Sequence, residues 1–349
     1  MGLTGFFRIP AALLVCAALG ACSGGDAPAA GGSNSSSSTP SPSPEVTTSV
    51  RPGPDGAMKP TDGRRTRIAA TIKVGTEPCG VVVAFGSAWV TDAGEARLFR
   101  ISLETNRVEA DFPLDDAPCE LTASGDSLWV TTQSGRLDRV DPESGRVTAR
   151  IKTGSTSYET IAAFGSLWVS NRGDGTLTQV DPATNRTRTR KLGISTPGGL
   201  VAADGHLWVG QDAPEETTVL RIDPDTWETD EVETQGRRPA WLAATDGVVW
   251  VAQTSSATVS GIDTGALQPI GLPAAAGFSP VNLEASPDGH WVWVPDDGEN
   301  FVTRIDARTG EAVERLLVES GPAVVAAGDD EVWVTNFGAG SVQRLTLGR

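Results

Sequence analysis

The chain has 349 residues, among them 40 glycines and 10 tryptophans, and its formal net charge is −16. Such an acidic chain is poorly suited to nucleic acid or anionic lipid surfaces, because phosphate groups are held by clusters of lysine and arginine. With only two histidines and four cysteines, the chain also shows no paired-cysteine metal motif.

The first 21 residues are typical of an export signal. Arg8 carries their one side-chain charge, an apolar run follows from Ile9 to Leu19, and the segment ends at Leu19-Gly20-Ala21-Cys22. The run is too short to span a bilayer as a helix. This ending resembles the lipobox of a bacterial lipoprotein. We expect residues 1–21 to be a signal peptide, with Cys22 lipidated and anchored on the extracytoplasmic side of the cell membrane.

Residues 22–64 form a polar segment rich in glycine, serine and proline. It includes Ser35 to Ser38 and then Thr-Pro-Ser-Pro-Ser-Pro. Such a composition has too little apolar surface to form a packed core. We therefore predict a disordered linker that holds one folded domain, residues 65–349, away from the membrane.

The folded domain is organised by a repeat of about 40 residues. Each copy contains an apolar residue followed by Trp-Val, with successive tryptophans 39 to 43 residues apart. A fixed period of this length indicates stacked structural units, because one unit cannot bury its own apolar face. The repeating tryptophans are Trp89, Trp129, Trp168, Trp208, Trp250, Trp293 and Trp333.

Four short β-rich runs can be distinguished in most copies. The first, such as residues 80–85 or 323–327, is small and apolar, as expected of the innermost strand of a propeller blade. The tryptophan strand comes second. The third ends in an aspartate, usually followed by proline, which we interpret as a turn former rather than as an acid or metal ligand. These aspartates are Asp141, Asp181, Asp223 and Asp306.

The last copy ends after a third strand, residues 341–347. Its missing fourth strand is predicted at the other end of the domain, since residues 67–75 match the fourth strand at 146–154 in pattern and spacing. The N-terminal strand should then complete the final blade and leave no open sheet edge. The fold class predicted is thus all-β, a seven-bladed β-propeller of four-stranded blades.

Two cysteines fall in the folded domain at equivalent places in adjacent copies. Cys79 and Cys119 each stand ten residues before a repeating tryptophan. Equivalent positions near the axis should lie close together, and such pairs normally oxidise outside the cytoplasm. We predict a disulfide. The alternative of a metal or redox site has no histidine or third cysteine beside the pair.

One face of the propeller is the candidate functional surface, because the first strand starts there and the second ends there. Glu120 and Glu159 break an otherwise small and apolar inner ring, together with Trp241 and Asn282; Tyr158, Arg237 and Arg238 lie close by in sequence. Three residues after each tryptophan a polar side chain recurs. It serves either to cap loop backbone or to bind a ligand. These positions are Asp92, Thr132, Asn171, Gln211, Gln253, Asp296 and Asn336.

These blade motifs resemble the YVTN and NHL-type propellers, particularly the streptogramin lyase (virginiamycin B lyase) branch. The motifs are proline, an apolar strand, Asp-Gly, Leu-Trp-Val and Ile-Asp-Pro. The resemblance implies a magnesium-dependent elimination that opens a cyclic ester, with a histidine base at the start of a first strand. None of the equivalent positions is histidine here. They hold Cys79, Cys119, Tyr158, Gly198, Ala240, Val281 and Ala323.

We therefore interpret the protein as a monomeric binding or scaffold module for a protein or small molecule, without a cofactor or metal. The alternative is a lyase or hydrolase acting on a cyclic ester, with Glu120 or Glu159 replacing the histidine base and magnesium required. His206 and His290 precede tryptophan strands, at the opposite face, and are interpreted as turn residues.

Overall fold

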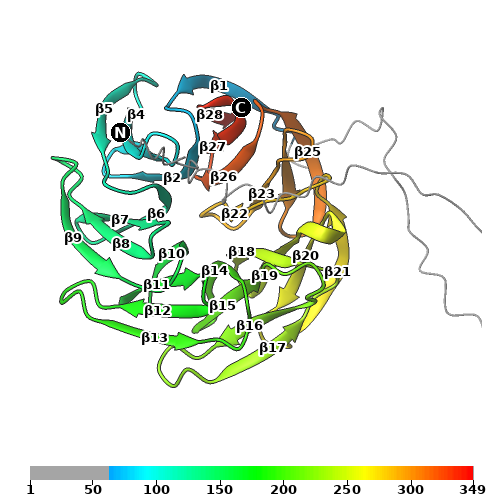
Figure 1. The fold of residues 1–349 in the computed structure, drawn as a ribbon. Coiled ribbons are helices and arrows are strands. Elements are labelled where there is room, and N and C mark those ends of the chain that lie inside the picture. The colour runs from blue at the N-terminus through cyan, green and yellow to red at the C-terminus, as the bar shows by residue number, and fades with distance from the viewer. Residues whose placement is uncertain (1–62, 349) are drawn as a thin grey trace, which may run out of the picture. The chain divides into compact units, whose positions relative to one another are not determined.

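The computed structural model describes residues 63–348 and confirms the predicted seven-bladed β-propeller. Seven four-stranded antiparallel sheets are arranged in a ring (Figure 1). The predicted signal peptide, Cys22 and the linker up to residue 62 lie outside the described residues. Within the described part no helix is long and apolar enough to cross a membrane. Its short 3-10 turns include Thr254–Ser256 and Phe337–Ala339.

We number the blades in chain order. Blade 1 comprises β2 (Pro78–Ala84), β3 (Ser87–Asp92), β4 (Arg97–Ser102) and β5 (Val108–Pro113). Blade 2 comprises β6 (Pro118–Ser124), β7 (Ser127–Thr132), β8 (Arg136–Val140) and β9 (Val147–Lys152). Blade 3 comprises β10 (Ser157–Ala163), β11 (Ser166–Asn171), β12 (Thr176–Val180) and β13 (Thr187–Lys191).

The remaining blades continue the pattern. Blade 4 comprises β14 (Pro197–Ala203), β15 (His206–Gln211), β16 (Thr218–Ile222) and β17 (Thr229–Glu233). Blade 5 comprises β18 (Pro239–Thr245), β19 (Val248–Gln253), β20 (Thr258–Asp263) and β21 (Gln268–Ala275). Blade 6 comprises β22 (Glu284–Ala285), β23 (Trp291–Asp296), β24 (Phe301–Asp306) and β25 (Glu311–Leu317). Blade 7 comprises β26 (Pro322–Ala327), β27 (Glu331–Asn336), β28 (Ser341–Leu347) and β1 (Thr66–Lys73).

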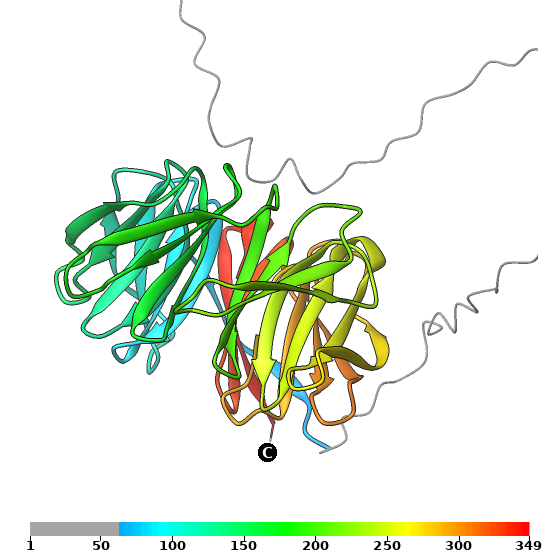
Figure 2. The ribbon, with the colours of Figure 1, turned by 90° about the horizontal axis from the view of Figure 1, so that it is seen from below.

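Blade 7 closes the ring with both ends of the domain, as predicted. Strand β1 pairs antiparallel with β28, from Thr66 opposite Leu347 to Lys73 opposite Ser341. Figure 1 shows the blue N-terminal strand lying against the red C-terminal strand. The first strands of neighbouring blades contact one another around the whole axis, so the ring is continuous. Seen side on, the strands of each blade run between the two faces of the propeller (Figure 2).

The repeating tryptophans lie between the blades. All seven are at most 3% exposed, and each lies on the second strand of its blade. In five blades the residue paired with the tryptophan across the sheet is an arginine. In four of these the guanidinium lies 5.1 to 5.9 Å from the indole centre, for example Arg139 over Trp129. Burial of the indoles packs each blade against the next, and the cation-π contacts add stability within a blade.

The aspartates that end the third strands form turns. Asp141 accepts hydrogen bonds from the backbone nitrogens of Glu143 and Ser144, and Asp181 and Asp223 bind the backbone in the same way. These bonds stabilise the ionised carboxylate and lower the pKa of Asp141. The prediction that these residues form turns is confirmed.

Candidate functional site: the central channel and its mouth

The first strands of most blades carry an irregularity of one or two residues at the same place. In six blades the pairing with the second strand shifts register there, for example between Pro118 and Leu121 in blade 2. A β-bulge re-aims the side chains that it contains. Cys119 and Glu120 occupy the bulge of blade 2, and Tyr158 and Glu159 that of blade 3. The bulges therefore present the predicted site residues at the axis.

Hydroxyl groups two residues after the tryptophans hold several bulges in place. Thr131 Oγ1 accepts from the backbone nitrogen of Glu120 at 3.0 Å and donates to the carbonyl oxygen of Tyr158 at 2.8 Å. Thr91 and Thr335 make equivalent bonds to the next blade, and both are fully buried. One side chain thus fixes a bulge and joins two blades at the axis.

Three glutamates without a basic partner in the described residues line the channel formed by the first strands. Glu120, Glu159 and Glu284 border an axial cavity of about 420 Å³, which is otherwise walled largely by valine, alanine and leucine. Its lining also includes Glu331, which pairs with Arg344. A second cavity of about 240 Å³ shares Glu159 and Glu284 and continues between blades 3 to 6. We call these two cavities the central channel. Gly80 leaves room for the Glu120 carboxylate, since a Cβ there would stand 2.9 Å from its Oε2.

Burial and mutual repulsion keep these carboxyl groups protonated at higher pH than usual. Burial raises the pKa of Glu159 to about 8, with a further increase from Glu284. Burial also raises the pKa of Glu284 to about 7. The pKa of Glu120 is raised well above its ordinary value by burial and then by Glu159, Cys119 and Glu284. Glu284 is exposed to the channel space, whereas Glu120 is only 5% exposed, so solvent screens Glu284 more.

An aromatic pair stands at the mouth of the channel. The rings of Tyr158 and Trp241 are 5.2 Å apart, and Trp241 also lines the channel. The guanidinium of Arg172 lies 5.1 Å from the centre of the Tyr158 ring. We call Tyr158, Trp241 and Arg172 the mouth cluster. It places two packed aromatic rings and a cation beside the row of carboxyl groups.

Asp212 holds two arginines at this edge of the mouth. Its side chain is 3% exposed, it pairs with Arg172, and it accepts from Arg238 Nε at 2.5 Å. Such buried, charge-assisted hydrogen bonds fix orientation. Arg238 is in the left-handed region at φ 57°. Arg237, in contrast, is exposed and pairs at 3.0 Å with the exposed Glu215.

The polar residues that follow the tryptophans cap loops. Asp92 accepts from the backbone nitrogens of Thr76 and Glu77, and Asp296 accepts from those of Phe278 and Ser279. The whole set is at most 4% exposed: Asp92, Thr132, Asn171, Gln211, Gln253, Asp296 and Asn336. These side chains lie under the loops rather than on an exposed surface. Their contacts are therefore those expected of residues that cap loop backbone, the first of the two alternatives considered from the sequence. Asn282 is also buried and accepts from the backbone nitrogen of Val325 at 3.4 Å.

The cysteine pair lies beside this mouth. The sulfurs of Cys79 and Cys119 are 3.6 Å apart, in contact and beyond the covalent length of about 2.05 Å. Both residues are buried. The structure brings the two residues together as the repeat requires, and the disulfide between them stays a prediction.

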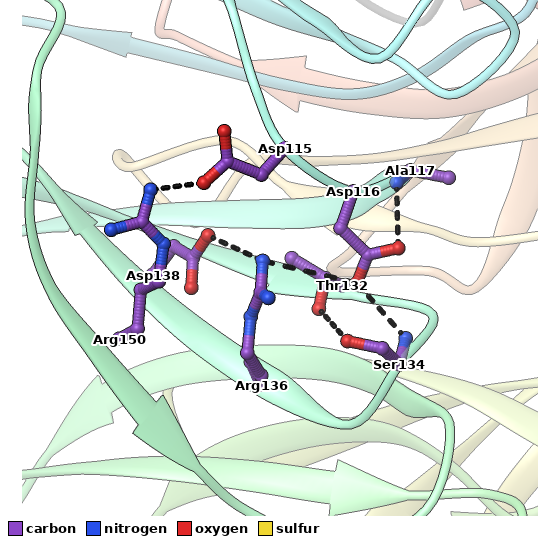
Figure 3. A network of polar contacts seen from close by, with 8 residues as sticks. All are labelled: Asp115, Asp116, Ala117, Thr132, Ser134, Arg136, Asp138 and Arg150. Carbon is purple, nitrogen blue, oxygen red and sulfur yellow. Dashed lines mark hydrogen bonds and ion pairs between the residues drawn. The ribbon is translucent and has the colours of Figure 1, made fainter.

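A polar network fixes the loop that leads into β6, the strand that carries Glu120 (Figure 3). Asp116, just before the strand, accepts from the backbone nitrogen of Ser134 at 3.2 Å, and Asp115 pairs with Arg150 of β9. Burial opposes ionisation of Asp116, but hydrogen bonds led by Ser134 outweigh it and lower the pKa. The loop is thereby tied to the outer strands of its own blade.

Neither histidine contributes to this site. His206 contacts the carbonyl oxygen of Asp204 at 2.8 Å within its turn, and His290 pairs with Asp288 at 2.7 Å. The hydrogen bond and charge of Asp288 raise the pKa of His290. Both turns join a first strand to a tryptophan strand, at the end opposite the mouth.

Comparison with known proteins supports the fold. No family model matches the sequence, and no curated protein sequence matches it. Among solved structures, the chain resembles virginiamycin B lyase from Staphylococcus aureus, in a catalytically inactive histidine-to-alanine variant with quinupristin. The TM-score is 0.69 at 15% identity, covering 81% of this chain and 99% of that one. The shared feature is the seven-bladed propeller.

Several site residues were not found from the sequence. Glu284 lies in the two-residue strand β22 and pairs with Trp293, two positions past the inner-ring residue Asn282. Arg172 and Asp212 each follow a polar capping position by one residue, a signal that could have pointed to them. The threonines at 91, 131 and 335 recur two residues after a tryptophan. This recurrence was visible in the sequence, but its role between blades was not.

Proposed function

We propose that the protein is a lipid-anchored extracytoplasmic propeller that binds a ligand at the mouth of its central channel. The observation that carries the proposal is the mouth cluster, in which Tyr158 and Trp241 pair at 5.2 Å directly beside the channel. Concave sites lined by apolar and aromatic groups with a few convergent polar groups are typical ligand sites. The lipobox-like ending at Cys22 supports the anchoring.

The alternative of a lyase or hydrolase retains one supporting observation. Glu159, with a pKa raised to about 8, could exchange a proton near neutral pH, as a general acid or base requires. The magnesium that the resemblance implies does not fit these residues. Within residues 63–348, no three His, Cys, Asp or Glu side chains are grouped to hold one ion. A catalytic role would thus rest on Glu120 or Glu159 alone.

Crosslinking in cells tests the binding proposal. The full lipoprotein would be crosslinked and purified as wild type, as Tyr158→Ala/Trp241→Ala, and as Phe164→Ala. Phe164 is an exposed aromatic in the turn at the other end of β10, so it controls for general loss of aromatic surface. We expect a bound species that the mouth variant loses and the control keeps. Identical recovery from all three proteins would contradict the proposal.

An enzyme would behave differently. If the wild type turned over a lactone or cyclic ester and either Glu120→Gln or Glu159→Gln did not, the lyase alternative would replace binding as the function.

Membrane anchoring is tested separately, since Cys22→Ser should move the protein from the membrane to the soluble fraction. Equal membrane association of this variant would contradict lipidation at that residue.

A further inference from the structure

Three of the four glutamates that line the central channel have no basic partner within residues 63–348, whereas the fourth, Glu331, pairs with Arg344. Glu120 is 5% exposed and faces the axial cavity, yet its carboxylate makes no hydrogen bond or ion pair with any residue of the described range 63–348. No lysine, arginine or histidine lines either part of the channel. A buried carboxyl group without a protein partner is costly to ionise, and the open cavity beside it gives a cation access to the carboxylate.

The shape of the channel indicates what kind of cation it takes. The axial part has a volume of about 420 Å³, with walls of valine, alanine and leucine between the carboxyl groups. Its acids are not grouped closely enough for three of them to share one metal ion, as stated above for the described residues. An extended molecule with an apolar stem and a charged end matches these walls better than a compact ion does.

The mouth of the channel adds a second feature that suits an organic cation. Trp241 lines the channel and pairs with Tyr158, so an aromatic side chain borders the path to the glutamates. Aromatic faces attract organic cations, and a carboxylate beyond them adds direct charge pairing. The Arg172 guanidinium that already lies over Tyr158 is held there by Asp212.

We propose that the central channel binds a linear alkylammonium compound, with its ammonium group among Glu120, Glu159 and Glu284 and its stem passing Trp241. This proposal rests on the proposed function and names the class of its ligand. A diamine or a lysine-like side chain has the required chemistry.

Binding should be linked to proton release. Glu120 is faced by Cys119 on its own strand, by Glu159 from β10 and by Glu284 from β22, and these groups together favour its protonated form. A bound cation favours the ionised form instead. Affinity for the amine should therefore rise as pH increases from 6 to 8.5, and protons should be released on binding. A purely apolar pocket would show neither effect.

Calorimetry on the mature lipoprotein in nonionic detergent tests the proposal. The probe is 1,5-diaminopentane, titrated at pH 6 and pH 8.5 in buffers of different ionisation heat, with 1,5-pentanediol as the uncharged control. We expect binding of the diamine alone, proton release, and at least tenfold weaker binding in Glu120→Gln. Glu104→Gln, at an exposed turn position, should bind as wild type. Should Glu120→Gln not fold, Glu284→Gln at the channel surface replaces it.

Each other outcome is decisive. Equal binding of diamine and diol, absence of heat with the diamine, or binding of Mg²⁺ or Ca²⁺ alone would overturn the proposal. If the diamine does not bind but the mouth variant still loses its crosslinked species, this inference fails while the proposed function stands. If the diamine binds through Glu120 but the mouth variant loses nothing in cells, the cation site stands while the proposed function fails.

Discussion

Replacing Glu159 with glutamine should change the pH dependence of stability in a defined direction. The folded protein holds the Glu159 proton up to a pKa of about 8, against an ordinary value of 4.5. Between these values the folded state binds more protons than the unfolded chain. The contribution of Glu159 to the free energy of unfolding is therefore complete below pH 4.5 and is lost as pH rises through about 8.

The size of the effect follows from the same pKa values. A pKa raised from 4.5 to about 8 corresponds to at most about 5 kcal/mol at high pH. Glu159 is half-buried and faces the channel, so screening reduces this to roughly 2–3 kcal/mol. Glu159→Gln should match wild type near pH 5 and be more stable by that amount at pH 9.

Urea unfolding from pH 5 to pH 9 measures this difference. Glu104→Gln serves as the control, because Glu104 is exposed at a turn far from the channel. We expect the wild-type midpoint to fall with pH more steeply than that of Glu159→Gln, while the control follows wild type. A wild-type-to-variant difference that is constant with pH, or a variant less stable at pH 9, would refute the electrostatic reasoning.

Three further predictions concern the fold around the channel. Deleting residues 65–75 removes the strand that pairs with β28, so the protein should aggregate or unfold; a monomer with unchanged melting temperature in gel filtration and calorimetry would contradict closure. Thr131→Val leaves the Glu120 nitrogen unpartnered and should cost roughly 1–3 kcal/mol in urea unfolding, whereas Thr131→Ser, which keeps the hydroxyl, should cost less; equal losses would count against the bridge. Exported protein should contain a Cys79–Cys119 disulfide that contributes about 4 kcal/mol in the chain-entropy model; mass spectrometry that found two unmodified thiols would disprove it.

The fold could be predicted because every blade repeats the same local signals. The Trp-Val strand, the Asp-Pro turn and the small first strand each occur several times, so an error in one copy is corrected by the others. The closing strand at residues 66–73 was found in the same way, by its likeness to the fourth strand of blade 2.

The site was predicted only in part, since it depends on departures from the repeat. Glu120 and Glu159 were recognised because a charge is unusual in a small apolar strand. Glu284 was missed because it lies two residues past Asn282, the inner-ring position of blade 6, and the repeat gave no reason to expect a channel group there. The capping residues such as Asp92 were correctly aligned at one end of the blades, but their burial depends on loops folding over them.

Native mass spectrometry tests the central claim most directly. The full-length protein would be purified from cells that make it, as wild type and as Tyr158→Ala/Trp241→Ala, and both would be measured under the same conditions. A channel-mouth binding site predicts an added mass or a bound partner on the wild type that is absent from the variant. The same bound species on both proteins, or none on either, would contradict a ligand held at the mouth.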